Sequence, residues 1–201
     1  AGSDVSSVSN VARRVNDRYI INANQMFITN GSIADFLIIL CVTNENEKVR
    51  SRRHSAILVE TDRKGFEANQ LKRKLGMRAS DTAEIHFSDV EVPLENLIGE
   101  LEGEGFYQLM AVFNRSRVTV AMISVGVSQG GLEKAISYSK QRKQFGSPLG
   151  SFQGIQFKLA DMASWIEASR ALCYKAAWMV DHGKIDPKLI SMAKWFAGEV
   201  G

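Results

Sequence analysis

The spacing of apolar residues changes from a period of two to a period near 3.6 close to residue 100, and this change limits the possible folds more than any motif does. Short strand-like runs separated by turns fill residues 1–98, whereas residues 99–201 show almost uninterrupted helical spacing. A run of strands followed by a run of helices indicates an α+β architecture. We therefore predict an antiparallel β sandwich or barrel domain over residues 1–98, followed over residues 99–201 by long helices of an incomplete four-helix bundle.

The β-like part contains apolar runs at residues 19–29, 36–42, 56–59 and 84–92. The first run ends at Asn30-Gly31, a dipeptide typical of tight turns. The second is continuously apolar, as expected of a strand that is buried on both faces. In the last run the alternation of polar and apolar side chains shifts at Ser88-Asp89. Such a shift predicts a β-bulge.

Helical spacing first covers residues 103–142, which predicts one helix of about 39 residues and, at about 1.5 Å per residue, close to 60 Å in length. A second helical pattern covers residues 152–182. Asp186 and Pro187 provide an N-cap and a first-turn proline for a third helix, which has no stop signal before the end of the chain. We therefore expect further members of the bundle beyond residue 201, and expect the sequence to be part of a longer protein.

Composition excludes several classes of function. The chain has 201 residues, of which 45% are hydrophobic and 23% charged, as in ordinary globular proteins. A net charge of +3 argues against an obligate nucleic-acid binder, so we interpret the basic cluster at residues 50–54 as a solvated loop. The two cysteines lie far apart, and the histidines at 54, 86 and 182 have no metal-like spacing and are expected at the surface. We expect no disulfide framework, no metal site and a reducing compartment. No apolar run reaches the roughly 18–20 residues of a membrane span.

Residues 142–146 carry the clearest indication of a binding surface. Arg142, Gln144 and Phe145 offer a guanidinium for phosphate, an amide for a polar edge and a ring for a flat ligand. The alternative is structural: a basic last turn complements the helix dipole before a glycine stop at Gly146. These residues by themselves favour the structural alternative, and only the other segments of the chain favour binding.

Two further positions also allow two interpretations. Arg117 lies on the apolar stripe of the first long helix, where a charge needs a partner or a ligand. Thr29 ends a strand beside Phe27, where its hydroxyl and main-chain N–H could meet a planar ligand. The structural alternative for Arg117 is an ion-paired or snorkelling side chain. For Thr29 it is a β-branched residue that simply favours strands. The residues by themselves leave these alternatives open.

Five segments together resemble the acyl-CoA dehydrogenase family, in the same order and at compatible spacings. They are residues 1–5, 25–31, 75–93 (75–82 followed by 87–93), 142–146 and 152–153. The first is similar to a family signature that ends in Gly-Ser-Asp, and the second to a Lys-Met-Trp-Ile-Thr-Asn-Gly strand. The resemblance covers essentially the whole chain. It implies the central β domain and the first half of the C-terminal helical domain, without the N-terminal helical domain.

The resemblance also implies contacts with FAD. The implied cofactor-binding positions are Ala1, Gly2, Phe27, Ile28, Thr29, Arg142, Gln144, Phe145, Phe152 and Gln153. In the family, the strand equivalent to residues 27–29 lies against the flavin, and the threonine hydroxyl reaches the ring nitrogen that receives hydride. Phe27 stands where tryptophan is more frequent, which keeps an aromatic face but loses the indole donor. Arg142, Gln144 and Phe145 are implied to reach the FAD of a neighbouring subunit.

The implied acyl-CoA-binding positions are Ser3, Asn114, Arg115, Ser116 and Arg117. Asn114 stands where family members commonly have aspartate, which weakens the case for that contact. The catalytic base in most members is a glutamate that would lie past residue 201, and in a minority it lies at the position of Ser116. A serine cannot serve as that base. We therefore expect no catalytic residue and no metal ligand within this sequence.

The resemblance implies an FAD-dependent oxidoreductase of fatty acid metabolism, active in β-oxidation. Such a flavoprotein desaturates an acyl-CoA between Cα and Cβ by abstracting the α-proton while hydride passes to FAD. The implied partners are the acyl-CoA substrate, an electron-transfer flavoprotein and further copies of the chain in a homodimer or homotetramer. The implied location is the bacterial cytoplasm or the mitochondrial matrix. We expect the 201 residues to be inactive alone.

Two alternatives remain open. One is a related flavoenzyme that uses oxygen, of the acyl-CoA oxidase or nitroalkane oxidase type. The other is a non-catalytic assembly protein derived from the family.

Overall fold

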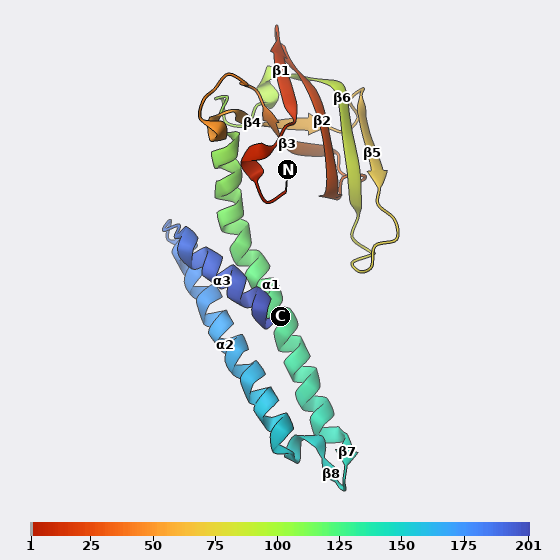
Figure 1. Cartoon of the computed structure of the whole chain (residues 1–201), viewed down its shortest axis with the longest axis vertical. Helices are drawn as coiled ribbons and strands as arrows, with labels where there is room; N and C mark the ends of the chain where they lie inside the picture. Colours follow the sequence, from red (N-terminus) through yellow and green to blue (C-terminus); the bar gives the residue numbers. More distant parts are fainter. Residues whose placement is uncertain (1) are drawn as a thin grey trace. The chain divides into compact units, whose positions relative to one another are not determined.

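The chain forms two compact units, Ala1–Met110 and Ala111–Gly201, in a computed structural model that describes residues 2–201 (Figure 1). The strands of the large sheet lie in the first unit, and the second contains two helices and most of a third. The predicted α+β class is therefore confirmed. None of the helices within residues 2–201 is both long enough and apolar enough to cross a membrane.

A six-stranded sheet with the order β4-β3-β1-β2-β6-β5 builds the first unit. Its strands are β1 (Val11–Val15), β2 (Arg18–Thr29), β3 (Phe36–Val42), β4 (His54–Glu60), β5 (Phe66–Gln70) and β6 (Thr82–Pro93). The antiparallel prediction is right for every pairing except that of β1 with β3, which is parallel and limited to Val11 and Val42. The exception arises because β3 does not pair with β2, which precedes it, but lies at the free edge of β1, where the Asn10 carbonyl accepts a hydrogen bond from the Val42 N–H at 2.7 Å.

The sheet curls around one apolar core. In Figure 1, β3 and β4 cross behind β2, and buried side chains from both parts of the sheet belong to the same cluster. Tyr19, Ile21, Ile57, Ile85 and Val90 in this cluster are each no more than 2% exposed. Burial of one such aliphatic side chain stabilises a fold by about 1.5–3 kcal/mol, so this core holds the two parts of the sheet together.

The predicted bulge at Ser88-Asp89 is confirmed. Ile21 pairs with Val90 and Ala23 pairs with Phe87, so β6 has one residue more than β2 between these two pairs. Asp89 adopts a positive φ of 50°. The extra residue bends β6, as bulges do.

The second unit contains the last part of α1 (Gly105–Gln141), all of α2 (Gln153–Asp181) and all of α3 (Pro187–Val200). A small hairpin of β7 (Lys143–Gln144) and β8 (Ser147–Pro148) joins α1 to α2. Short 3₁₀ turns are η1 (Val5–Ser7), η2 (Arg50–Arg52), η3 (Leu94–Asn96) and η4 (Leu149–Ser151). The N-cap predicted for the third helix is confirmed, because the Asp186 carboxylate accepts hydrogen bonds from the Lys188 and Leu189 N–H groups at 3.0 and 3.1 Å.

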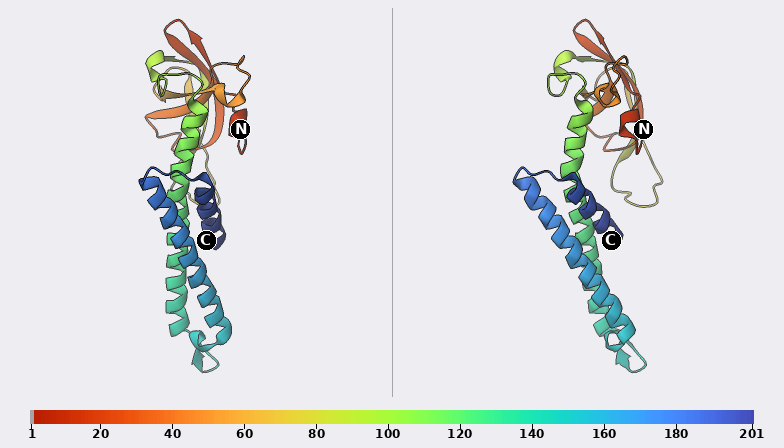
Figure 2. Two further views of the ribbon diagram at one scale, coloured as in Figure 1. Left: turned by 90° about the vertical axis from the view of Figure 1, so that its left-hand side faces the viewer. Right: turned by 60° about the vertical axis from the view of Figure 1, so that its left-hand side comes forward.

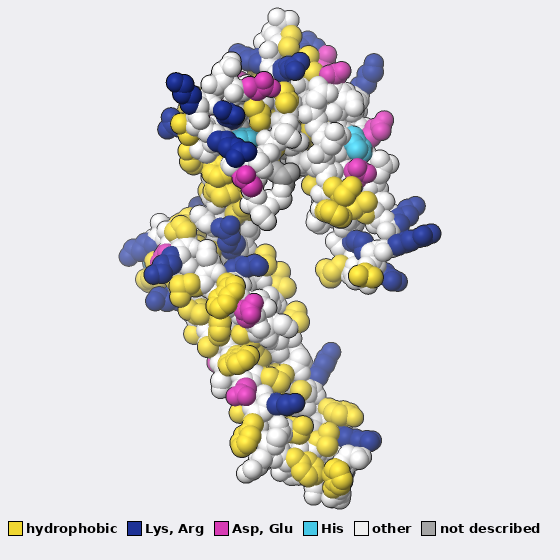
Figure 3. All heavy atoms as spheres, viewed as in Figure 1, with side chains coloured by type: hydrophobic (Ala, Val, Ile, Leu, Met, Phe, Trp, Pro, Cys, Tyr) yellow, Lys and Arg dark blue, Asp and Glu magenta, His cyan; other side chains and the backbone are white. Residues whose placement is uncertain are grey.

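The helices of the second unit share one core but leave large apolar side chains outside it. In the views of Figure 2, α2 runs beside the second part of α1, and Val125, Ile166 and Ile190 from the three helices lie in one buried cluster. Trp178 and Trp195 are 55% and 65% exposed, and Figure 3 shows apolar side chains along these helices. Such exposed apolar faces suit packing against other helices or subunits.

The surface prediction is wrong for His54. Its side chain is 1% exposed, and Nε2 lies 3.1 Å from the Val8 carbonyl oxygen. His54 opens β4, whose first four residues are all buried. The place of the residue in the strand therefore decides its burial, although the neighbouring Arg52 is exposed as predicted.

Candidate functional site

A second bulge, not predicted from the sequence, displaces Phe27 from the ladder of β2. Gln25 pairs with Ile85 and Ile28 pairs with Ala83, so β2 has one residue more than β6 between these pairs. Phe27 adopts a φ of 63°, a region that bulky L-residues rarely occupy. Its ring is 71% exposed. Bulges that redirect a side chain in this way are over-represented beside ligand sites.

A groove of about 480 Å³ lies along this part of β2, and we call it the β2 groove. It is lined by Gly2, Val8, Ser9, Asn10, Asn24, Gln25, Met26, Phe27 and Ile28. The lining combines an aromatic ring and apolar side chains with several carboxamides. This chemistry suits a flat ligand that has an apolar face and a polar edge.

The β2 groove brings together three of the predicted positions, Gly2, Phe27 and Ile28, although 24 residues separate Gly2 from Phe27 along the chain. Thr29 is exposed and follows directly at the end of β2, but it is not part of the lining. Ser3 is exposed beside Gly2. Ala1 lies outside the described residues. The grouping supports a ligand site here, while the role of each residue stays a proposal.

Asp4 anchors the chain next to Ser3. The Ser6 hydroxyl donates to its carboxylate at 2.6 Å, and the Arg50 guanidinium lies 3.6 Å away. The hydrogen bond from Ser6, and then the charge of Arg50, lower the pKa of Asp4 below its usual value. The first residues therefore approach the β2 groove with a fixed negative charge at neutral pH.

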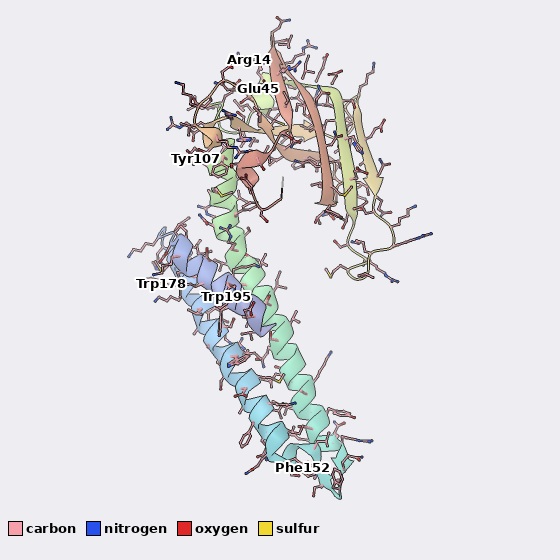
Figure 4. The ribbon with its side chains drawn as sticks, viewed as in Figure 1. Arg14, Glu45, Tyr107, Phe152, Trp178 and Trp195 are labelled. Carbon is pink, nitrogen blue, oxygen red and sulfur yellow. The ribbon has the colours of Figure 1, made fainter. Side chains whose placement is uncertain are left out.

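The hairpin at residues 143–148 carries the second group of predicted positions. Phe145 and Gly146 form its two-residue turn with φ values of 50° and 78°, the backbone that a tight antiparallel hairpin requires. Phe145 is 95% exposed, and its ring meets the ring of Phe152 edge to face with centroids 6.2 Å apart. Figure 4 labels Phe152 beside this hairpin. The turn therefore presents an aromatic pair to its surroundings.

Arg142 lies between the end of α1 and this hairpin. Its main-chain N–H donates to the Tyr138 carbonyl and its carbonyl accepts from the Leu149 N–H, both at 2.9 Å. Within residues 2–201 no carboxylate lies within ion-pair distance of its guanidinium. Gln144 and Gln153 are exposed nearby in sequence. A main-chain-anchored arginine beside exposed amides and rings is suited to a ligand that has both phosphates and a flat ring system.

The polar residues of α1 have local partners. Arg117 is half-buried, donates to Asn114 Oδ1 at 3.0 Å and lies 5.9 Å from the centre of the Phe113 ring. The Ser116 hydroxyl donates to the Phe113 carbonyl at 3.3 Å, and Arg115 is exposed. These contacts give the charge on the apolar stripe local partners, while a contact of Arg117 with a ligand stays a proposal.

Several residues that line the β2 groove are not among the predicted site positions. Gln25 and Met26 belong to the resembling segment, and their positions on β2 could have indicated them. Asn24 precedes them and lies 2.7 Å from His86 Nδ1 through its Oδ1. Asn10 is 6% exposed and donates to the Leu40 carbonyl at 3.0 Å. No local pattern indicates Asn10, because only the curl of the sheet brings it to the groove.

No group of three His, Cys, Asp or Glu side chains within the described part of the chain is arranged to hold a metal ion. The groove and the hairpin belong to different compact units.

Two family models match the chain. The acyl-CoA dehydrogenase middle domain matches residues 1–90, and the acyl-CoA dehydrogenase C-terminal domain matches residues 103–201. An acyl-CoA dehydrogenase of Bacillus subtilis is 42% identical over 201 residues, which cover 99% of this chain and 52% of the relative. The chain thus spans about half the length of the curated relatives that it matches.

Solved structures show the same similarity. The acyl-CoA dehydrogenase from Geobacillus kaustophilus aligns with a TM-score of 0.95 and 38% identity, over 100% of this chain and 52% of that one. A chain in a structure of the electron transferring flavoprotein of Acidaminococcus fermentans aligns with a TM-score of 0.93 and 40% identity. The alignment covers 100% of this chain and 52% of that one.

Proposed function

Since this chain belongs to the acyl-CoA dehydrogenase family, we propose that it carries flavin-contacting segments of an FAD-dependent enzyme that desaturates an acyl-CoA between Cα and Cβ. The single observation that supports this most is the outward-turned Phe27, which forms part of a groove together with Gly2 and Ile28. An exposed ring held at a positive φ is costly for a structural role alone, and it suits a surface that meets a flat ligand.

The β2 groove would bind the ring system of FAD. The Phe27 ring would cover one face, and the Thr29 hydroxyl at the end of β2 would donate to a ring nitrogen. When bound, FAD supplies the acceptor for a hydride from the substrate. The residues of the chain orient the ring and limit its contact with water.

The hairpin would bind a different part of FAD, in a neighbouring subunit. The Arg142 guanidinium, which has no carboxylate partner in the described part of the chain, suits a pyrophosphate. The exposed Phe145 and Phe152 rings with Gln144 and Gln153 suit the adjoining edges. A homodimer or homotetramer follows from this assignment, because a subunit would complete the cofactor site of another.

The acyl-CoA would be bound by Ser3 and by residues 114–117, and we place no base among the residues of this chain. Ser116 lacks a group that is basic enough to remove an α-proton. Electrons would pass to an electron-transfer flavoprotein, and the enzyme would act in the β-oxidation of fatty acids, in the bacterial cytoplasm or the mitochondrial matrix. We also propose that the β domain comprises residues 1–98 and the helical domain residues 99–201.

Anaerobic reduction of the bound flavin tests the proposal. The complete holoenzyme that contains these residues is expected to be yellow and to lose its flavin absorbance when an acyl-CoA is added without oxygen. Reoxidation by an electron-transfer flavoprotein, with little oxygen consumption, is expected of a dehydrogenase. Rapid oxygen consumption would instead indicate the oxidase alternative, and a colourless protein that refuses added FAD would indicate the assembly alternative.

A further inference from the structure

Asp81 directly precedes β6, and its nearly buried carboxylate forms hydrogen bonds with two other segments of the chain. Its side chain is 8% exposed. Oδ2 accepts a hydrogen bond from the Ser32 N–H at 3.1 Å, and Oδ1 accepts from the Ser32 hydroxyl at 2.8 Å and from the Gln70 amide at 3.0 Å. The carboxylate therefore links the turn after β2 to the end of β5.

The main chain around Asp81 holds the same turn. The Asp81 carbonyl accepts from the Asn30 N–H at 3.2 Å, and the following residue, Thr82, pairs with Thr29. The turn packs closely against β6, because a Cβ on Gly31 would lie only 3.0 Å from the Ala83 Cβ. In Figure 1 the end of β2 lies beside the adjoining ends of β5 and β6.

Residues 27–29 are consequently held at both of their ends. The bulge at Phe27 sets the direction of the chain on one side, and the turn bound by Asp81 sets it on the other. Asp81 itself is not part of the β2 groove, so it would act on a ligand there only through this segment.

A carboxylate at position 81 can accept all of the hydrogen bonds offered there, whereas an amide cannot. Three donor groups converge on the two oxygens, and an ionised carboxylate only accepts hydrogen bonds. In an asparagine one oxygen would become an NH₂ group facing another donor. The Ser32 N–H, then the Ser32 hydroxyl and the charge of Lys74 nearby, lower the pKa of Asp81. The acceptor pair is therefore present at neutral pH.

We infer that Asp81 is a positioning residue for the flavin site: it holds the turn after Thr29 so that residues 27–29 keep the conformation that faces the ring. This inference rests on the proposed function. A purely structural aspartate would lower stability when replaced but would leave the bound flavin unchanged.

The test compares Asp81→Asn with the wild-type holoenzyme. We expect FAD to bind about tenfold more weakly, because the loss of one charge-assisted hydrogen bond would loosen the segment that contacts the ring. We also expect a shifted visible spectrum and midpoint potential of the flavin that remains bound. Ser32→Ala removes only the hydroxyl donor, so this variant should fold even if Asp81→Asn does not. It should change FAD affinity, the visible spectrum and the midpoint potential in the same direction as Asp81→Asn, but by less.

Asp186→Ala is the matched control, because it removes a carboxylate with two main-chain hydrogen bonds at the N-cap of α3. It should lower the melting temperature while the flavin spectrum and potential stay unchanged. If Asp186→Ala alters the flavin as Asp81→Asn does, general destabilisation explains both and the inference is overturned.

A double-mutant cycle with Thr29→Val tests the route of the effect. If Asp81 acts through the end of β2, the two substitutions will weaken FAD binding by less than the product of their single effects. Additive effects would contradict the inference and leave the proposed function intact. A complete wild-type protein that binds no FAD would instead overturn both, and a complete holoenzyme that contains these residues but whose flavin no acyl-CoA reduces would overturn only the proposed function.

Discussion

At the scale of single residues, Phe27 shows how backbone strain and ligand contact are linked. An aromatic residue at a φ of 63° costs about 1–3 kcal/mol relative to a relaxed backbone. The fold tolerates this cost because the ladder of β2 and β6 is intact on both sides of the bulge. Packing of the ring does not explain the strain, since Phe27 is mostly exposed. Such strain is expected at a position that contacts a ligand.

Comparison of Phe27→Gly with Phe27→Ala separates the strain from the ring. Both variants lose the aromatic face, so FAD should bind at least tenfold more weakly to each. Glycine adopts the positive φ freely, so the apo form of Phe27→Gly should be about 1 kcal/mol more stable than that of Phe27→Ala. Thermal unfolding and FAD titration measure the two effects. Equal stability of the two variants would show that the bulge relaxes without the ring.

At the scale of elements, each helix depends on its ends as well as on its buried face. The α3 helix has 14 residues, and isolated helices of this length are marginal in water. Its N-cap and Pro187 therefore matter to the packing of Ile190 and Ala193 in the core of the second unit.

Asp186→Ala should lower the free energy of unfolding by about 1 kcal/mol, because the first turn of α3 loses the acceptor for two N–H groups. Chemical denaturation followed by circular dichroism measures the change. Asp181→Ala is the control, since Asp181 ends α2, where a negative charge is unfavourable to the helix dipole. That variant should be neutral or slightly more stable, and an equal loss in both would contradict the capping argument.

The ion pair of Glu60 and Arg63 makes the stability of the β unit depend on pH. Glu60 ends β4, and Arg63 also donates to the Glu91 carbonyl of β6 at 2.9 Å. The hydrogen bond from Arg63 lowers the pKa of Glu60 from 4.5 to about 2. Because the pKa is depressed in the folded state, the stabilisation is complete above about pH 4.5 and is lost as the pH falls towards 2.

This contribution should be no more than about 1 kcal/mol, because the pair is partly exposed to solvent. Urea unfolding of wild type and Glu60→Gln between pH 2 and 7 measures it. The two proteins should differ at pH 7 and converge near pH 2. A difference that stays constant over this range would assign the effect to packing rather than to charge.

At the scale of the whole molecule, the two groups of predicted cofactor residues belong to different compact units. Gly2, Phe27 and Ile28 meet in the β2 groove, whereas Phe145 and Phe152 meet at the hairpin of the helical unit. The exposed apolar faces of the helices provide surface for assembly. Cofactor binding and subunit association are therefore expected to depend on each other.

Arg142→Ala in the holoenzyme should weaken FAD retention and subunit association together, each by about tenfold, because one guanidinium would serve a cofactor shared between subunits. Gel filtration at several protein concentrations and the ratio of flavin to protein measure the two effects. Lys140→Ala removes a neighbouring charge from the last turn of α1 and should change neither. Unchanged flavin content in Arg142→Ala would instead support the structural alternative, in which Arg142 only complements the dipole at the end of α1.

Local residue patterns were enough to predict the α+β class, the turn at Asn30-Gly31, the bulge at Ser88-Asp89 and the cap at Asp186, because each depends on neighbours within a few residues. The resemblance to the family added residues 25–31 and 142–146 as expected binding segments. The folded chain was needed to learn that Gly2 lies beside Phe27, that Asn10 and Asn24 line the same groove, that His54 is buried and that Asp81 holds the turn after β2. These features arise from strand pairing and sheet curl between residues far apart in sequence, and local periodicity carries no information about such contacts.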